Sequence, residues 1–150
     1  MPNHNEHLIW GAVAGAGYCL VSSSVVRGRE ISLAELLGGA LSGAVASKLP
    51  DLLEPATHPN HRSTFHSVSF LITTGVVGLP WAERERQRQY QLAEYARSQA
   101  NMPANETNKG YWQRKAIWHE FVAGLIAGFV VGYISHLVAD SFTPKRLPIL

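Results

Sequence analysis

Four stretches of apolar and small residues alternate with polar segments along the chain, at residues 8–26, 33–49, 68–82 and 121–139. Each is 15 residues or longer and rich in alanine, leucine or glycine, which favours helices over strands. No stretch keeps the alternation of apolar and polar positions that marks a half-buried strand. The pattern predicts an all-α fold with about four core helices, and the length predicts a single domain over residues 1–150.

Signals for helix ends accompany these stretches. Ser32 can cap the second predicted helix, with Glu35 completing a capping box, and Ser63 can cap the third. A proline stands where each of the last three helices is expected to end: Pro50, Pro80 and Pro144.

The insert between the third and fourth stretches, residues 83–115, is charged and polar. It opens with alternating glutamate and arginine at residues 83–86, which is typical of an exposed helix with local ion pairs. Residues 101–110 follow as a polar loop. We interpret the insert as an exposed charged helix and a loop that leave a compact bundle.

The composition adds to this picture. Hydrophobic residues make up 46% of the chain and charged residues 16%, compared with about 25% charged in an ordinary soluble domain. The formal net charge is only +2 and the basic residues are scattered, so we expect no stable nucleic-acid binding. Cys19 is the only cysteine, which excludes an intramolecular disulfide, and its small and apolar neighbours predict a buried thiol.

Membrane insertion is favoured by two of the stretches. Residues 121–139 number 19, close to the ~20 that cross a bilayer, and residues 8–26 are comparable. The other two are shorter, Glu35 and Lys48 interrupt the second, and the mean hydropathy is −0.03. The first residues lack the basic region of a secretory signal, so we expect no cleaved leader. The pattern favours a membrane-spanning protein and leaves a soluble, cytoplasmic or peripheral bundle as the alternative.

Small residues recur at intervals of four in three of the predicted helices. The rows are Gly11 and Gly15; Gly39, Gly43 and Ser47; and Gly124, Gly128 and Gly132. This spacing flattens one ridge of a helix, so that a neighbouring helix can approach closely. The rows therefore predict a glycine-ridged bundle, and they could also serve contacts between copies in a homo-oligomer.

Each row leads to a candidate metal ligand when it is continued by four positions: His7 before Gly11, Asp51 after Ser47, and His136 with Asp140 after Gly132. Because the rows would pack on one another, we expect these side chains to converge at one end of the bundle. His136 and Asp140, one helical turn apart, can share an ion. The alternative is a hydrogen-bonded core histidine with a carboxylate at a helix end.

Another group of polar residues surrounds the expected start of the third helix. His61 and His66 flank Ser63, and Arg62 lies between them, so both imidazoles could face one cavity while Arg62 binds a phosphate or carboxylate. A structural or surface role is the alternative for each. His119 could serve as an extra ligand or, beside Trp118, in packing.

Several of these residues together resemble the signatures of a known family. They are Leu49-Pro50-Asp51, His61-Arg62, His66-Ser67, Gly132-Tyr133, Ser135-His136, Asp140 and Thr143-Pro144. They look like those of the bacterial membrane-bound metal-dependent hydrolases, a group that includes LexA-regulated inner-membrane proteins. The resemblance implies a helical protein of the bacterial inner membrane with a divalent metal and a hydrolytic activity. The arrangement is similar, more distantly, to that of the all-helical zinc-dependent phospholipase C and P1-type nucleases, in which His and Asp from several helices bind a metal cluster.

The sequence departs from the family pattern at Leu53 and Glu54, where an aspartate and a histidine usually follow the Pro-Asp motif. The resulting hypothesis is a metal-dependent hydrolase that cleaves a phosphoester, with a lipid as one candidate substrate, through a metal-activated water. Zinc is the preferred ion, and the candidate ligands are His7, Asp51, His66, His136 and Asp140. Glu54 or His61 would act as general base, and Arg62 would stabilise negative charge. The alternative is a non-catalytic membrane or assembly protein with a structural His/Asp cluster.

Overall fold

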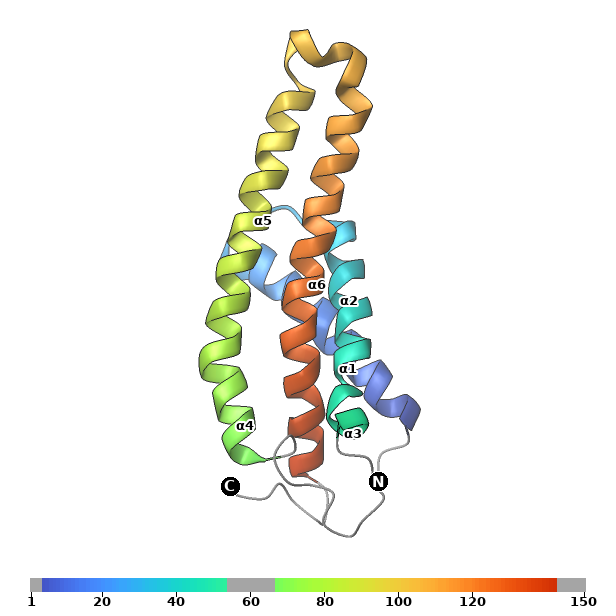
Figure 1. Cartoon of the computed structure of the whole chain (residues 1–150), viewed down its shortest axis with the longest axis vertical. Coiled ribbons are helices and arrows are strands. Elements are labelled where there is room, and N and C mark those ends of the chain that lie inside the picture. The colour runs from blue at the N-terminus through green and yellow to red at the C-terminus, as the bar shows by residue number, and fades with distance from the viewer. Residues whose placement is uncertain (1–3, 54–66, 143–150) are drawn as a thin grey trace.

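The computed structural model describes residues 4–53 and 67–142, and the fold is all-α as predicted, with no strand in these residues (Figure 1). The elements are α1 (His4–Leu20), the π-helical segment η1 (Val21–Val26), α2 (Leu33–Ala46), α3 (Leu49–Leu53), α4 (Val68–Thr73), the π-helical segment η2 (Thr74–Gly78), α5 (Leu79–Ala100), the 3₁₀ segment η3 (Pro103–Asn108) and α6 (Lys109–Ser141).

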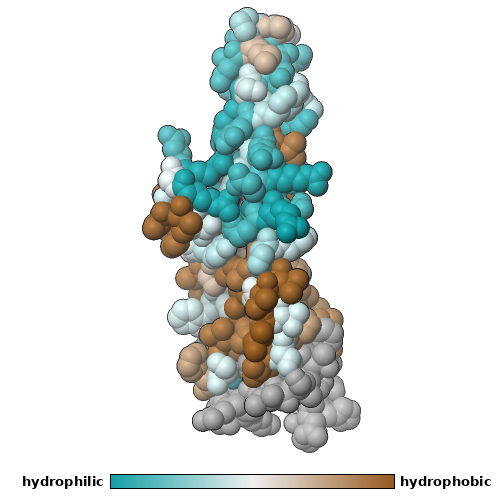
Figure 2. All heavy atoms as spheres, turned by 90° about the vertical axis from the view of Figure 1, so that its left-hand side faces the viewer, coloured by the Kyte–Doolittle hydropathy of each residue, from teal (hydrophilic) through white to brown (hydrophobic). Residues whose placement is uncertain are grey.

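The long helix α6 organises the molecule, because α1, α2 and α5 all pack against it. Helices α5 and α6 run antiparallel and extend past the other helices as a hairpin (Figure 1). All four apolar stretches lie in the lower half of the molecule in this view, below the part of the hairpin that extends past the other helices. We call this lower part the apolar half. Figure 2 shows the same division on one face: hydrophilic side chains cover the hairpin and hydrophobic ones gather below it.

The sequence-based helix limits are wrong at the third stretch. Pro80 was expected to end a helix, yet α4, η2 and α5 follow one another directly and Pro80 lies in the first turn of α5. The residues before Pro80 are already helical, and the π-helical segment η2 lies where the proline interrupts the backbone hydrogen-bond ladder, so the helix continues through it. The charged insert, residues 83–115, is consequently not a separate helix: it contains most of α5, the 3₁₀ segment η3 where a polar loop was expected, and the start of α6. Helix α2 does end before Pro50, which lies in α3, and Pro144 falls outside the described residues.

Helix capping follows the sequence in part. Ser32 caps α2, and its hydroxyl accepts a hydrogen bond from the backbone N–H of Glu35 at 3.3 Å, as predicted. The Glu35 carboxylate forms an ion pair with Arg86, so the observed cap uses only the Ser32 side chain. Ser63 lies outside the described residues, and α4 is capped by Ser67.

The closest helix contacts occur where the glycine rows meet. The carbonyl oxygens of Gly39 and Gly43, both on α2, lie against glycines of α1 on one side and of α6 on the other. A Cβ built on Gly15 or Gly128 would lie 2.1 or 2.2 Å from the Gly39 oxygen, and one on Gly11 or Gly132 would lie 2.3 Å from the Gly43 oxygen. Such distances exclude any side chain, so the backbones of α1, α2 and α6 touch as the spacing predicts.

Large side chains of α2 face outward instead of into this core. Leu33, Leu37, Leu41 and Val45 are each more than half exposed, whereas the buried positions of the helix are glycine, alanine, serine and one glutamate. Cys19 is fully buried, as predicted. An interior of small residues with an apolar exterior is typical of helices that pack inside a lipid bilayer.

A buried polar network joins η1, α2 and α5 just above the apolar half. The Arg86 guanidinium, 0% exposed, donates to Glu35 at 2.5 Å, to the Tyr90 hydroxyl at 2.7 Å and to Ser22 at 2.9 Å. The Ser23 hydroxyl lies 3.0 Å from Glu35 and donates to it. Removing one partner of such a buried ion pair typically costs about 3–5 kcal/mol, because the other charge is left without compensation.

The protonation of Tyr90 completes this network. Burial raises the pKa of Tyr90 to about 12, so its hydroxyl keeps the proton at neutral pH and donates it to Glu35 at 2.5 Å.

The expectation that the charged insert is solvated is wrong for one face of α5. That face is buried at Ala82, Arg86, Tyr90, Ala93, Ala96 and Ala100.

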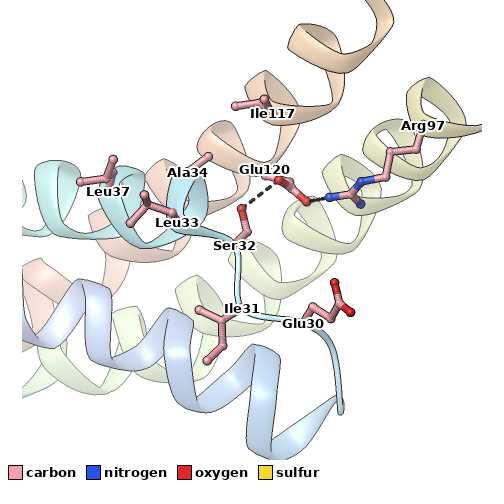
Figure 3. Close-up of a pocket in the computed structure, with 9 residues that line it drawn as sticks. All are labelled: Glu30, Ile31, Ser32, Leu33, Ala34, Leu37, Arg97, Ile117 and Glu120. Atoms are coloured by element: carbon pink, nitrogen blue, oxygen red, sulfur yellow. Dashed lines mark hydrogen bonds and ion pairs between the residues drawn. The ribbon is translucent and has the colours of Figure 1, made fainter. Parts of the chain in front are cut away.

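A groove of about 480 Å³ lies where the start of α2 meets the hairpin (Figure 3). Inside it, the Ser32 hydroxyl donates to Glu120 of α6 at 2.8 Å, and Arg97 of α5 forms an ion pair with the same carboxylate. These bonds fasten the connection between η1 and α2 to both helices of the hairpin.

Two helices of the described chain are long and apolar enough to cross a membrane. They span Glu6–Val26 and Pro103–Ser141, and so contain the first and last apolar stretches of the sequence. In α6 the apolar part, residues 121–141, is about 30 Å long at 1.5 Å per residue, which matches the hydrocarbon thickness of a bilayer.

We expect Gly43→Ala to lower the free energy of unfolding by about 1–3 kcal/mol, because the added methyl group would lie 2.2 Å from the Gly11 oxygen. Gly17→Ala is the matched control. It adds the same group to α1 with no atom within 4 Å, and should be neutral or stabilising by up to about 1 kcal/mol. Thermal unfolding in detergent, followed by the helical circular dichroism signal, measures both. Equal midpoints for Gly43→Ala and wild type would contradict the close-contact core.

Candidate metal centre

Four side chains of types that can ligate a metal meet at the end of the bundle opposite the tip of the hairpin. His7 comes from the start of α1, Asp51 from α3, and His136 and Asp140 from the last turns of α6. The His136 Nε2 atom lies 3.6 Å from Asp51 Oδ1 and 3.5 Å from Asp140 Oδ2. The His7 and His136 rings face each other, with centroids 4.4 Å apart.

The helix packing described above produces this meeting point. The contact of Gly11 and Gly132 with Gly43 lies one turn from His7 on α1 and one turn from His136 on α6. Ser47, fully buried, lies 2.7 Å from the backbone oxygen of His7 and donates to it. The start of α1 is therefore fixed to the end of α2, and the imidazole of His7 faces that of His136 on α6.

The position of Asp51 depends on a different contact. α3 and α4 pack against α6 through a small apolar cluster that includes Ala46, Tyr133 and Leu137. Phe70 of α4 stacks on Tyr133 with ring centroids 5.4 Å apart. This cluster holds α3 beside the last turns of α6 and so brings the Asp51 carboxylate next to His136.

Burial differs among the four side chains. His7, His136 and Asp140 are 5%, 1% and 1% exposed, whereas the side chain of Asp51 is 41% exposed. The Nδ1 atom of His7 is buried and has no hydrogen-bond partner within the described residues. A buried imidazole nitrogen without a donor or acceptor is costly unless a ligand satisfies it. Access from solvent is on the Asp51 side.

The geometry of the cluster fits a small divalent cation. One ligand atom from each of His7, Asp51 and His136 lies within 4.8 Å of the others, so this group could hold a metal ion. The separations around His136 Nε2, 3.6 Å to Asp51 and 3.5 Å to Asp140, are close to those between neighbouring ligand atoms of a metal ion bound at about 2.0–2.2 Å. Histidine with carboxylate is a donor set that suits zinc and similar borderline cations.

The other candidate site residues predicted from the sequence lie outside the described residues or away from this cluster. Glu54, His61, Arg62 and His66 lie outside the described residues, so the structure does not test them. His119 lies about 25 Å along α6 from His136, and its Nδ1 is 2.8 Å from the amide oxygen of Gln89. His119 therefore belongs to the packing of α5 on α6 and not to this cluster.

The role of Ser47 was not predicted from the sequence. Its position predicted only a small residue in the α2 row, whereas its hydroxyl also donates to the His7 carbonyl and so helps to position the imidazole. The replacement of glycine by serine at one place in the row was the available signal, because a buried hydroxyl needs a partner.

The fold and the cluster together define a class: an all-α protein with an apolar half suited to a membrane and a partly buried His/Asp group that could hold a metal ion. The sequence matches the family model described as YdjM inner membrane protein over residues 1–150, and the chain belongs to this family. Neither a curated protein nor a solved structure matches it. The prediction of a bacterial inner-membrane family and location is thereby confirmed, and the hydrolase type stays a prediction.

We expect His136→Ala to lower the zinc content of dialysed protein by about tenfold or more, since His136 Nε2 is the atom that the other ligand groups surround. His119→Ala, which removes the histidine bonded to Gln89, should leave it unchanged. The metal-to-protein ratio of protein purified without a histidine tag gives the result. Binding should weaken as the pH falls, because protons compete with the cation for the imidazoles. Equal zinc in both variants would refute the assignment.

Proposed function

We propose that the chain is a metal-dependent hydrolase of the inner membrane that cleaves a phosphoester. The observation that carries the proposal is the meeting of His7, Asp51 and His136, from α1, α3 and α6, at spacings that could hold one cation, with Asp140 beside His136. The resemblance of the motifs around Asp51 and His136 to those of membrane-bound metal-dependent hydrolases supports it. Family membership alone supports only the location.

The chemistry follows from the roles of the side chains. A divalent cation held here would polarise a substrate oxygen and lower the pKa of a bound water toward 7. His7, His136 and Asp140 are buried and would form the fixed part of the site, while the half-exposed Asp51 lies where substrate and water enter. His66 is a further candidate ligand.

Residues 54–66 follow Asp51 in the sequence and carry the proposed reacting groups. Glu54 or His61 would accept a proton from the attacking water, and Arg62 would stabilise negative charge on the phosphoryl oxygens with its planar fork of donors. In the family motif that this sequence resembles, an aspartate and a histidine usually stand where this chain has Leu53 and Glu54. Glu54 therefore occupies the position of the histidine.

The burial of three ligands supports a second candidate function, a structural ion in a non-catalytic membrane protein. A structural ion is enclosed by protein ligands, whereas a catalytic one keeps a position for water. His7, His136 and Asp140 are consistent with an enclosed ion, and the exposure of Asp51 favours the catalytic alternative. A catalytic ion would be needed for hydrolysis, whereas a structural ion would be needed only for stability.

The distribution of basic residues indicates which side of the membrane the cluster faces. Nine of the thirteen belong to the connection between η1 and α2 or to the hairpin: Arg27, Arg29, Arg84, Arg86, Arg88, Arg97, Lys109, Arg114 and Lys115. The other four are Lys48, Arg62, Lys145 and Arg146. Cytoplasmic segments carry the excess of lysine and arginine. We therefore assign the hairpin to the cytoplasm and the cluster to the outer surface of the membrane.

We expect Asp140→Asn to abolish both zinc retention and hydrolysis. Of Glu54→Gln and His61→Ala, the variant that removes the general base should keep zinc but lose about 10²–10⁴-fold in rate. His119→Ala should keep both. Assays with a soluble aryl phosphoester and with phospholipid vesicles, at matched zinc content, measure the rates. If wild type hydrolyses neither substrate while Asp140→Asn loses zinc and melts at a lower temperature, the ion is structural and the hydrolase proposal fails.

The orientation is tested with single added cysteines, since the native Cys19 is fully buried. In intact spheroplasts a membrane-impermeant maleimide should label Ser141→Cys, at the cluster end, and should label Glu106→Cys, in η3, only after permeabilisation. Labelling of the Glu106→Cys protein in intact cells, with protection of the Ser141→Cys protein, would reverse the orientation.

A further inference from the structure

A groove of about 490 Å³ runs along the outside of the bundle between α1 and α6, beside the metal-ligating cluster. Its walls are Trp10, Val13 and Ala14 of α1 and Ser135, Val138, Ala139 and Phe142 of α6. The Ser135 hydroxyl is directed to the backbone oxygen of Gly132 at 2.7 Å, so it adds no available donor to the wall. The groove therefore offers an apolar ligand surface with almost no hydrogen-bonding capacity.

The groove and the cluster are built from the same turns of the same two helices. Ser135 directly precedes His136, Ala139 directly precedes Asp140, and Trp10 follows His7 by one turn. Residues at these offsets point to neighbouring sides of a helix. A molecule lying in the groove would thus have one end within about one helical turn of the ligand atoms.

The groove opens outward to the environment of the apolar half. Trp10, Val13 and Val138 are 61%, 57% and 41% exposed, and Phe142 is 85% exposed. In an inner-membrane protein this part of the surface faces lipid. Tryptophan is enriched at the level where acyl chains meet headgroups, which is the level expected for Trp10, near one end of its spanning helix.

We propose that this groove binds the acyl chain of a membrane phospholipid whose phosphoester headgroup lies at the His/Asp cluster. The assignment rests on the proposed function for the role of the cluster, and it names the substrate class: a glycerophospholipid taken laterally from the leaflet on the cluster side. Continuity with the cluster, the apolar walls and the opening toward the bilayer all favour an acyl chain over a protein segment. Cavities of this size are typical of small-molecule sites.

Lipid labelling in the wild-type protein gives the first test. The protein is reconstituted in vesicles of phosphatidylethanolamine and phosphatidylglycerol that contain phosphatidylglycerol with a photoreactive acyl chain. After illumination, peptides spanning residues 10–14 and 135–142 should be labelled several-fold more strongly than the peptide around Leu41, which faces outward on α2. Equal labelling of both surfaces would mean ordinary bilayer contact and would overturn the proposal.

A groove-filling variant gives the second test. Ala14→Trp places an indole in the groove two turns from His7 and should reduce labelling of residues 135–142 by about tenfold. Leu41→Trp adds the same group to the lipid-facing side of α2 and should change nothing. Both variants should keep the zinc content of wild type, which shows that the cluster is intact. Undiminished labelling in a folded, zinc-loaded Ala14→Trp protein would overturn the proposal.

Hydrolysis assays with two substrates distinguish lipid binding in the groove from hydrolytic activity at the cluster. Ala14→Trp should lose activity on phospholipid vesicles but keep activity on a soluble aryl phosphoester, because the small substrate does not use the groove. If wild type hydrolyses neither ester yet its groove is labelled selectively, lipid binding stands and the hydrolase fails. If the soluble ester is hydrolysed and labelling is not selective, the hydrolase stands and the groove assignment fails.

Discussion

The direct contact of the α2 backbone with its two neighbours is the constraint on which the other features depend. Gly39 and Gly43 lie at van der Waals distance from glycines of α1 and α6, which leaves no freedom to slide or rotate these helices without a clash. The register set there continues one turn further, to His7 on α1 and His136 on α6. In a bilayer, where apolar side chains gain little by leaving lipid, such close packing is a main source of helix association. The position of the metal-ligating side chains is thus a consequence of how small the core residues are.

Two polar clusters mark opposite ends of the apolar half, and they differ in the charges that they bring together. At the hairpin end, the buried guanidinium of Arg86 pairs with the carboxylate of Glu35 and also donates to Tyr90, although its Nε atom has no hydrogen-bond partner among the described residues. At the other end, two imidazoles and two carboxylates meet, and the buried Nδ1 atom of His7 has no hydrogen-bond partner in the described part of the chain. A buried carboxylate that is already paired with a guanidinium is typical of a structural contact, whereas imidazole with carboxylate is a donor set that suits a metal ion. The structural ion pair and the candidate metal site therefore lie at opposite ends of the apolar half.

Much of the fold could be predicted from sequence, because hydropathy over windows of 15 residues or more reports helices well. The failure at Pro80 came from assigning a stop to a proline that lies in a first turn. The insert was taken as wholly exposed because average polarity hides a single buried stripe, here from Ala82 through Arg86 and Tyr90 to Ala93. Spacings of four, four and three along that stripe were the signal. At the candidate site, His7, Asp51, His136 and Asp140 were found from the glycine spacing, since a row of small residues points along the ridge that it belongs to. The groove at Trp10 could not be found in this way, because it depends on the side-by-side placement of α1 and α6.

The ion pair between Glu35 and Arg86 has a consequence for the order in which the protein is made. The two residues are 51 positions apart, so at about 5–20 residues per second the glutamate waits roughly 3–10 seconds for its partner to be synthesised. During that interval the α1–α2 pair carries an acidic group at the membrane boundary without its counter-charge. A nascent chain that stops before α5 keeps this defect permanently.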